Sequence, residues 1–180
     1  MNDKVLGRRE LEVYIPRRDE GWFYVRMISD PETMAYNAPW FPPDGCIPNA
    51  EEAWENLYQT WNSPDSGMFY AYLRRKTDGR FVGDVNYHTD PEGDRYEMGI
   101  VICAPERGRG YGREGLRLLL EKAFGEDGIP GLYNSFERTR EAACIVHKAL
   151  GFRETGMENG LVRLELTRRA YLSKTCAEEG

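Results

Sequence analysis

The residues best suited to chemistry lie in one stretch, Ile102–Gly115, which reads ICAPERGRGYGREG. In it Arg107, Arg109 and Arg113 alternate with glycines, between an apolar run and a segment with helical spacing. Arginines supply charged hydrogen-bond donors, glycines let the backbone approach a ligand, and a helix start adds unpaired N–H groups. The pattern therefore predicts a loop that binds an anion such as a pyrophosphate.

Two known loop designs fit these glycines. Gly110, Gly112 and Gly115 satisfy the dinucleotide pattern G-x-G-x-x-G, and Glu137 follows where a ribose-binding acid could lie. However, the segment APERGR separates the strand from the first glycine, and only 65 residues follow Gly115, too few for the second half of a doubly wound fold. The other design is R-x-x-G-x-G, filled by Arg107, Gly110 and Gly112.

With the second design, the sequence resembles the GNAT superfamily of acyl-CoA-dependent N-acetyltransferases, especially the subgroup similar to ribosomal-protein and small-amine N-acetyltransferases. Five segments carry the resemblance in the family's order: RFVGDVNYH (80–88), YEMGIVI (96–102), GRGYGREGL (108–116), KALGF (148–152) and LELTRRAYL (164–172). The resemblance spans nearly the whole chain. It implies a single GNAT-like domain over residues 7–172 and a C-terminal tail over 173–180.

The spacing of apolar residues predicts an α/β (α+β) fold. Alternation and turn residues predict strands over 11–15, 69–74, 81–87, 95–103, 131–137 and 162–166. Helical spacing predicts helices within 21–36 and over 51–61, 110–124 and 140–150, with Asp19 and Thr139 as caps. The nearly continuous apolar run before Cys103 predicts a central strand buried on both faces. The resemblance implies a mixed, mostly antiparallel sheet of six to seven strands, about four flanking helices, and splayed fourth and fifth strands.

The resemblance also implies acetyl-CoA as co-substrate, with its pyrophosphate on the loop and its pantetheine arm along the fourth strand. Gly99 fits either a close backbone approach there or a glycine beneath a large neighbour. Arg140 stands where the family has an asparagine that holds the arm, and Asn134 lies just upstream. The expected cofactor contacts are Ile100, Val101, Ile102, Arg107, Gly108, Arg109, Gly110, Tyr111, Gly112, Arg113 and Asn134.

Acetyl transfer to an amine needs a neutral nucleophile, and an alkylammonium of pKa about 10 is roughly one part in a thousand neutral at pH 7. Glu97 has the place of the family's strand-borne general base; otherwise it pairs with Arg95 or faces solvent. His147 replaces the tyrosine that many members use as general acid toward the leaving thiolate. Its other interpretation is a histidine at the edge of the apolar face without a catalytic role.

Acceptor contacts are expected from the first half of the chain. Trp40 and Phe41 lie in a proline-flanked loop and are candidates for the pocket, whereas Trp54, Tyr58 and Trp61 have the helical spacing of core residues. Asp84 is a further candidate and, with Asp90 and Asp94, could form an acidic rim for a cationic acceptor. A small-molecule amine and a protein N-terminus both remain open as acceptors.

The composition of the chain limits the partners, the location and the metal sites that can be expected. The 180-residue chain has a net charge of −6, which argues against nucleic acid as a partner. It has no apolar segment for a signal peptide or membrane span, so no membrane partner and a cytoplasmic location are expected. Four scattered cysteines without C-x-x-C spacing predict reduced thiols and no metal site. A homodimer is common among relatives and is one expectation.

The sequence thus predicts an N-acetyltransferase that moves an acetyl group from acetyl-CoA to a primary amine by direct attack in a ternary complex. The alternative is an acyl-CoA-binding regulatory module that has lost turnover. Arg140 in place of asparagine and His147 in place of tyrosine are the departures from the family pattern that favour this alternative.

Overall fold

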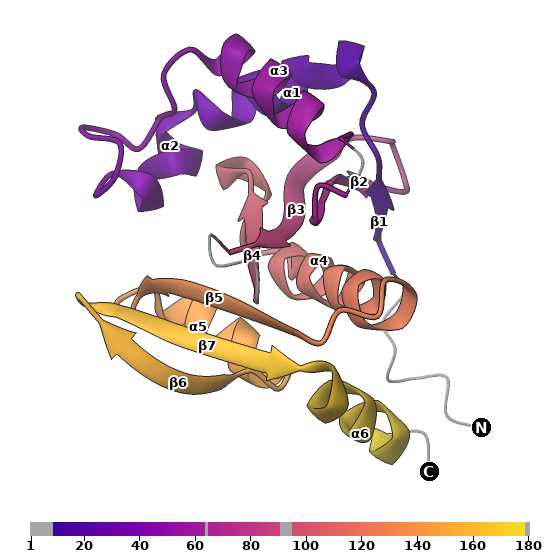
Figure 1. Ribbon diagram of the computed structural model, residues 1–180. Coiled ribbons are helices and arrows are strands. Elements are labelled where there is room, and N and C mark those ends of the chain that lie inside the picture. The colour runs from indigo at the N-terminus through magenta and orange to yellow at the C-terminus, as the bar shows by residue number, and fades with distance from the viewer. Residues whose placement is uncertain (1–8, 64, 91–94, 179–180) are drawn as a thin grey trace.

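The computed structural model describes residues 9–63, 65–90 and 95–178. These residues form a seven-stranded sheet of order β1-β2-β3-β4-β5-β7-β6 (Figure 1). Only the β4–β5 pair is parallel, and the other neighbours are antiparallel. The strands are β1 Leu11–Tyr14, β2 Met68–Arg75, β3 Phe81–Thr89, β4 Tyr96–Ile102, β5 Gly131–Glu137, β6 Arg153–Glu158 and β7 Leu161–Thr167.

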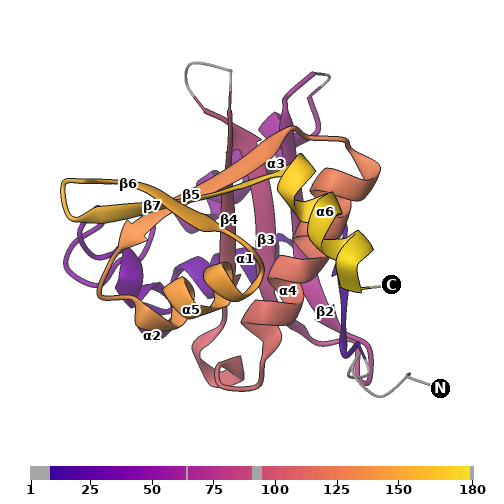
Figure 2. The ribbon, with the colours of Figure 1, turned by 90° about the horizontal axis from the view of Figure 1, so that it is seen from below.

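Helices cover both faces of the sheet. On the first face lie α1 (Gly21–Ile28), α2 (Pro31–Met34), the 3-10 turn η2 (Ala35–Asn37) and α3 (Ala50–Trp61), and on the second face lie α4 (Tyr111–Leu120) and α5 (Glu141–Ala149) (Figures 1 and 2). Short turns η1 (Arg18–Glu20) and η3 (Ala104–Glu106), the π-helical turn η4 (Glu121–Glu126) and α6 (Arg168–Glu178) complete the described elements.

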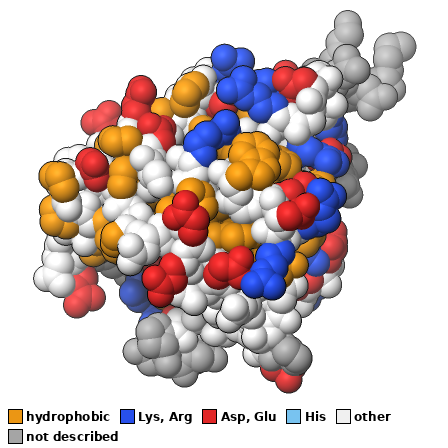
Figure 3. All heavy atoms as spheres, turned by 90° about the horizontal axis from the view of Figure 1, so that it is seen from above, with side chains coloured by type: hydrophobic (Ala, Val, Ile, Leu, Met, Phe, Trp, Pro, Cys, Tyr) orange, Lys and Arg blue, Asp and Glu red, His pale blue; other side chains and the backbone are white. Residues whose placement is uncertain are grey.

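The two faces have different cores. Beneath α1 and α3 the core is aromatic, with Phe23, Trp54, Tyr70 and Tyr72 buried together. Beneath α4 it is mainly aliphatic, built on leucines such as Leu116 and Leu119. On the outer surface above α1–α3, hydrophobic side chains alternate with acidic and basic ones (Figure 3).

Successive side chains of β4 point alternately to the two faces of the sheet and so enter the two cores in turn. Met98, Ile100 and Ile102 pack against the α4 core, whereas Val101 and Cys103 pack against the aromatic core. In an antiparallel pair, partners in register share a face, so Asp84, which pairs with Val101, also faces the aromatic side.

The sheet opens between β4 and β5. In the described chain these strands pair in register only through Glu97 and Tyr133, so β4 beyond Glu97 has β3 on one side and no β5 partner. Figure 2 shows β5–β7 running across the direction of β2–β4. The predicted splay of the fourth and fifth strands is therefore present, and it opens toward the carboxyl ends of both strands.

The structure corrects several expectations. Of β4 only Met98 is fully buried, because the splay uncovers the strand that the apolar run predicts to be buried on both faces. Helix α5 begins after Arg140 rather than at a Thr139 cap, and Asp19 lies inside η1. Strand β6 is exposed at every residue and has no alternating pattern.

The helices of the described residues are all too short or too polar to cross a membrane.

Candidate active site

The glycine loop before α4 presents backbone amides. Gly108 and Gly110 have φ values of +77° and +83°, a left-handed conformation that glycine adopts without steric cost. Left-handed residues of this kind turn successive N–H groups toward one concavity, and the first N–H groups of α4 lack intrahelical acceptors. A Cβ at either glycine would meet nothing within 4 Å, so the positive φ angles rather than crowding explain the glycines. These amides could hold the anion that the sequence predicts for this loop.

Arg107 uses its side chain on the protein. Its guanidinium donates to the carbonyl of Ile102 at 3.1 Å, of Glu32 at 3.2 Å and of Thr33 at 2.8 Å. The Thr33 hydroxyl in turn accepts from the Ala104 amide at 2.9 Å. Two donors of Arg107 thus tie the loop to α2, and a third ties it to the end of β4. The predicted direct contact of Arg107 with the ligand would have to come from its remaining donors.

The other expected loop contacts divide into side-chain and backbone roles. Arg109 is 55% exposed, and its Nε lies 3.7 Å from the buried carboxylate of Glu106, which also pairs with Arg75 and Arg80. Arg113 is exposed on the first turn of α4. Tyr111 is only 4% exposed, and its ring belongs to the α4 core, so it offers an amide rather than a side chain.

The open edge of β4 leads from this loop into the splay. Ile100, Val101 and Ile102 turn their side chains into the two cores, so their backbone groups are what they can offer a ligand. A Cβ on Gly99 would lie 2.8 Å from the Asn86 amide nitrogen, so the glycine makes room for a large neighbour. No irregularity of register interrupts β3 and β4 at this point in the described pairing.

His147 is buried, with 2% exposure, between the rings of Phe136 and Phe152. Its Nδ1 lies 2.8 Å from the Ala143 carbonyl, which can only accept, so Nδ1 carries the proton. Nε2 then accepts from the Asn134 side-chain amide at 3.2 Å. Burial lowers the pKa of His147, which keeps the ring neutral. In this geometry the histidine orients Asn134 and has no free proton for a leaving thiolate.

Glu97 lies at the closed end of the splay. Its side chain is 37% exposed, and its carboxylate is 3.9 Å from His88 Nε2, in the neighbouring strand. It lines a pocket of about 450 Å³ formed with β5, β6 and β7, beside Tyr133 and Arg163. The carboxylate is open to solvent and to a ligand in this pocket.

Asp84 lies in a different setting. It is 4% exposed, and its Oδ2 accepts a hydrogen bond from the Tyr70 hydroxyl at 2.7 Å. Its Oδ1 has no hydrogen-bond partner among the described residues. Burial raises the pKa of Asp84 to about 7, although the Tyr70 hydroxyl and the Val101 backbone offset part of the increase. Asp84 is therefore not part of an exposed acidic rim.

The remaining acceptor candidates are scattered. Asp90 is 4% exposed and pairs with Arg95 at 3.1 Å, so it is buried too, whereas Asp94 lies outside the described residues. Trp40 and Phe41 are 49% and 38% exposed on the loop before α3, and neither lines the pockets described here. Their role in acceptor binding stays a prediction.

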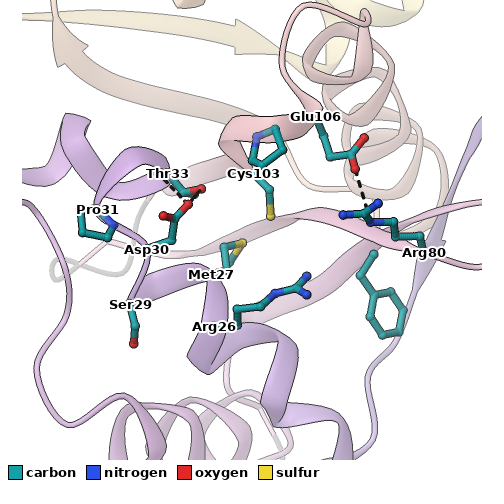
Figure 4. A pocket seen from close by; sticks show the side chains of 11 residues that line it. Arg26, Met27, Ser29, Asp30, Pro31, Thr33, Arg80, Cys103 and Glu106 are labelled. Carbon is teal, nitrogen blue, oxygen red and sulfur yellow. Dashed lines mark hydrogen bonds and ion pairs between the residues drawn. The ribbon is translucent and has the colours of Figure 1, made fainter.

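A second pocket, of about 560 Å³, lies where α1, α2 and the end of β4 meet (Figure 4). Arg26 and Met27 approach it from α1, Asp30 from the start of α2, and Cys103 from the end of β4 (Figure 4). Burial raises the pKa of Cys103 to about 11, so this thiol is protonated at neutral pH. The described residues contain no group of three His, Cys, Asp or Glu side chains placed to hold a metal.

Sequence reasoning did not identify a contact between η2 and the β5–α5 connection. The Arg140 guanidinium lies over the Tyr36 ring, 4.6 Å from its centroid, and Glu137 at the end of β5 adds a buried carboxylate oxygen without a hydrogen-bond partner among the described residues. These residues come from η2 and from the β5–α5 connection. Only the substitution of the usual asparagine by Arg140 signalled that this region differs.

Comparisons with known proteins agree with this geometry. Residues 11–153 match the acetyltransferase (GNAT) domain family. The chain is similar in structure to spermidine N-acetyltransferase from Vibrio cholerae in complex with CoA and spermine, with 19% identity, a TM-score of 0.75, and coverage of 92% of this chain and 99% of that chain. It is also similar to an acetyltransferase (GNAT family) from Bacillus anthracis, with 15% identity, a TM-score of 0.69, and coverage of 91% and 98%.

A third similar structure is apo FdhC, a nucleotide-linked sugar GNAT, with 11% identity, a TM-score of 0.75, and coverage of 95% of this chain and 94% of that chain. No curated protein sequence matches the chain. At these identities the structural likeness shows the fold alone, whereas the family match covers most of the sequence. This protein therefore belongs to the GNAT family of acetyl-CoA-dependent N-acetyltransferases.

Proposed function

We propose that this chain acetylates a primary amine by direct attack on acetyl-CoA held in a ternary complex. The observation that carries the proposal is the continuity between the amide loop at Gly108–Gly112 and the unpaired edge of β4. An anion bound at the loop would place an attached extended chain along that edge, where backbone groups lack a strand partner. The family's pyrophosphate and pantetheine arm have this relation to each other.

Different residues would bind different parts of acetyl-CoA. The loop amides, Arg109 and Arg113 would hold the phosphates, and Gly99–Ile102 would offer backbone hydrogen bonds to the arm. Asn134 can meet the arm from β5, because His147 fixes its side-chain amide. Since His147 has its one proton on Nδ1, we assign it this positioning role in place of the acid role that its sequence position suggests.

The acceptor would approach from the aromatic face of the sheet, on the side of β4 opposite α4. Two carboxylates lie on that face of β3 and β4, Asp84 and Glu97. Either carboxylate could take the proton that an ammonium loses before it attacks. The spermine found with the Vibrio cholerae enzyme makes alkylamines the first acceptors to test here.

The experiment is isothermal titration with acetyl-CoA, CoA and NADH, followed by acetyl-transfer assays with n-butylamine, spermidine and a peptide N-terminus. We expect saturable binding of acetyl-CoA and CoA, none of NADH, and transfer to at least one amine. Binding of acetyl-CoA without transfer to any amine would favour the regulatory-module alternative. NADH binding without acetyl-CoA binding would contradict the proposal.

A matched pair of variants tests the loop. Gly110→Ala places a side chain at φ +83°, where it meets no neighbour, so the change disturbs the amides through the backbone alone. Gly128→Ala is the control, because it also has a positive φ of +68° and open space but lies after η4. We expect at least a tenfold loss of acetyl-CoA affinity in the first and less than twofold in the second.

A further inference from the structure

The packing of the aromatic core leaves Asp84 unexplained. Its carboxylate is almost completely removed from solvent, one oxygen accepts from Tyr70, and the other has no hydrogen-bond partner among the described residues. Burying a carboxylate oxygen without a donor is costly, and native structures satisfy nearly all such groups. The arrangement is therefore understandable if Oδ1 is used by a group that enters the site.

The surroundings of Asp84 suit a cation. No lysine or arginine pairs with it in the described part of the chain, and Tyr70 packs edge-on against Tyr24 and Tyr72 with centroids 6.2 and 5.9 Å apart. An anion among aromatic rings attracts an ammonium through both charge and the ring faces. The titratable groups that face Asp84 are Tyr24 of α1, Tyr36 of η2, Tyr70 and Tyr72 of β2, and Cys103 after β4.

Asp84 also lies beside the splay. It pairs in register with Val101, in the part of β4 that has no β5 partner. The pKa of Tyr36 is raised to about 12 by burial and by the Asp84 charge, and the Arg140 guanidinium lies over the Tyr36 ring, 4.6 Å from its centroid. Asp84 therefore lies on the aromatic face of the sheet, across from the part of β4 that is open to the splay.

We propose that Asp84 binds the reacting ammonium group of the acceptor and takes its proton. This inference rests on the proposed function and adds to it the residue that prepares the nucleophile. Oδ1 would accept the hydrogen bond from the ammonium, while the Tyr70 hydroxyl holds Oδ2 in place.

The chemistry balances with acetyl-CoA as the only co-reactant. One ammonium proton passes to the Asp84 carboxylate and from there to solvent. The neutral nitrogen then forms a bond to the acetyl carbonyl carbon as the carbon–sulfur bond breaks, and the sulfur takes the bonding electrons. A second proton leaves the nitrogen for the sulfur, so the products are the amide, the CoA thiol and one released proton.

The raised pKa of Asp84 is consistent with this role. Burial raises it to about 7, and a general base works best when its pKa is near the working pH. An ordinary aspartate would be a much weaker base toward an alkylammonium. If Asp84 had only a structural role, burying its carboxylate would lower the stability of the fold without any gain in activity.

The test compares Asp84→Asn with Asp19→Asn, a matched control whose side chain is 76% exposed. Acetyl transfer is measured with whichever of n-butylamine, spermidine and the peptide amine the wild type uses best, and acetyl-CoA binding is titrated in parallel. We expect Asp84→Asn to lose 10²–10⁴-fold in kcat/KM while binding acetyl-CoA within threefold of wild type, and Asp19→Asn to lose less than twofold.

A pH profile separates catalysis from structure. In the wild type, log kcat/KM should fall on the acid side as Asp84 is protonated. Tyr70→Phe removes the hydrogen bond that lowers the pKa of Asp84, so this acid limb should move to higher pH. The proposal would be overturned if the acid limb of the kcat/KM profile stayed at the same pH in Tyr70→Phe. It would also be overturned if this limb persisted unchanged in Asp84→Asn. Both readouts depend on the position of the limb, so a partly unfolded fraction of either variant does not change them.

The outcomes distinguish the two proposals. Retention of more than one-fifth of wild-type kcat/KM by Asp84→Asn, or a larger loss in Glu97→Gln, overturns the role of Asp84 and leaves the acetyltransferase proposal standing. A wild type that binds acetyl-CoA and acetylates none of the amines contradicts the proposed function, and the role of Asp84 falls with it.

Discussion

Two carboxylates on the same face of the sheet, Glu97 of β4 and Asp84 of β3, lie near opposite ends of β4 and in opposite environments. At the closed end, Glu97 is 37% exposed and lies beside His88, where β4 still pairs with β5. Toward the open end, Asp84 is 4% exposed, has one unpartnered oxygen, and lies beside Val101, where β5 has moved away. Four residues of extended strand, about 13 Å, separate Glu97 from Val101.

The sequence motif and the three-dimensional environment therefore favour different residues as the general base. Glu97 has the place that the family pattern marks for a base. Asp84 has the burial, the raised pKa and the nearness to the open β4 edge that the chemistry needs. The following changes test how sharply the two ends differ, in order of decreasing effect.

The largest expected effect is a gain in stability. The folded protein raises the pKa of Asp84 from 3.8 to about 7. The stability linked to its protonation is complete below about pH 4 and is lost as the pH rises through about 7. At pH 8, Asp84→Asn should therefore raise the free energy of unfolding by up to about 4 kcal/mol.

Denaturant unfolding at pH 8 and pH 4 measures this gain. It should vanish at pH 4, and Asp19→Asn should show none at either pH. A variant that is less stable than wild type at pH 8 would mean that Asp84 holds the core together, which would remove the contrast with Glu97.

Two glycines probe the tightness of packing near the two carboxylates. A Cβ at Gly83, next to Asp84, would lie 2.0 Å from the Val101 carbonyl oxygen, whereas a Cβ at Gly99 would meet the movable Asn86 amide at 2.8 Å. Gly83→Ala should cost about 3 kcal/mol, because the backbone of β4 must shift, and Gly99→Ala about 1 kcal/mol or less. Equal losses in urea unfolding would show that the two positions are equally constrained.

His147, on the α5 side of β5, should titrate in the opposite sense to Asp84. Burial lowers its pKa, so the stability that it contributes is present above its unfolded pKa of about 6.5 and is lost as the pH falls. Below about pH 6.5, His147→Gln should reduce the slope of the free energy of unfolding against pH by at most about 1.4 kcal/mol per pH unit.

The same variant tests the assignment of His147 as a positioning residue. It should leave the alkaline limb of the kcat profile in place, since the neutral ring has no proton for the thiolate. Loss of that limb in His147→Gln would restore the histidine as the general acid.

The smallest effect is expected at the closed end. The His88–Glu97 pair is 3.9 Å apart and both side chains are more than one-third exposed, so solvent screens it. A double-mutant cycle with His88→Ala and Glu97→Gln should give a coupling energy below about 0.5 kcal/mol. A coupling of 2 kcal/mol would indicate a buried, structured pair and would weaken the contrast drawn here.

Much of the fold could be predicted because its signals are local. Strands β2 to β5, α3 and the loop before α4 follow from alternation, helical spacing and glycines. Strand β6 could not be predicted, since no residue of it is buried and its pairing with β7 alone defines it. The glycine and arginine pattern of the loop is also local, so the loop could be singled out from the sequence, whereas the tertiary contacts that commit the Arg107 side chain to α2 could not.

Contacts between distant segments explain what sequence reasoning missed. Asp84 is isolated from solvent because Tyr70 and Tyr72 lie on the neighbouring strand under α1 and α3, a result of pairing and packing. The Tyr36–Arg140 contact joins the first and last thirds of the chain. A single sequence carries no signal for such pairs, so an aspartate at a strand's middle could be read only as a charged side chain near the site.

The attachment of α2 by Arg107 has a consequence for how the two substrates influence each other. Arg107 and Thr33 fasten α2 to the anion-binding loop, and the chain runs from Thr33 directly to Tyr36, which faces the acceptor side. Only about one turn of backbone therefore separates the proposed anion-binding loop from the side proposed to meet the acceptor. If binding at one side changes the affinity of the other through this turn, thermodynamic reciprocity requires that the second substrate change the affinity of the first by the same factor.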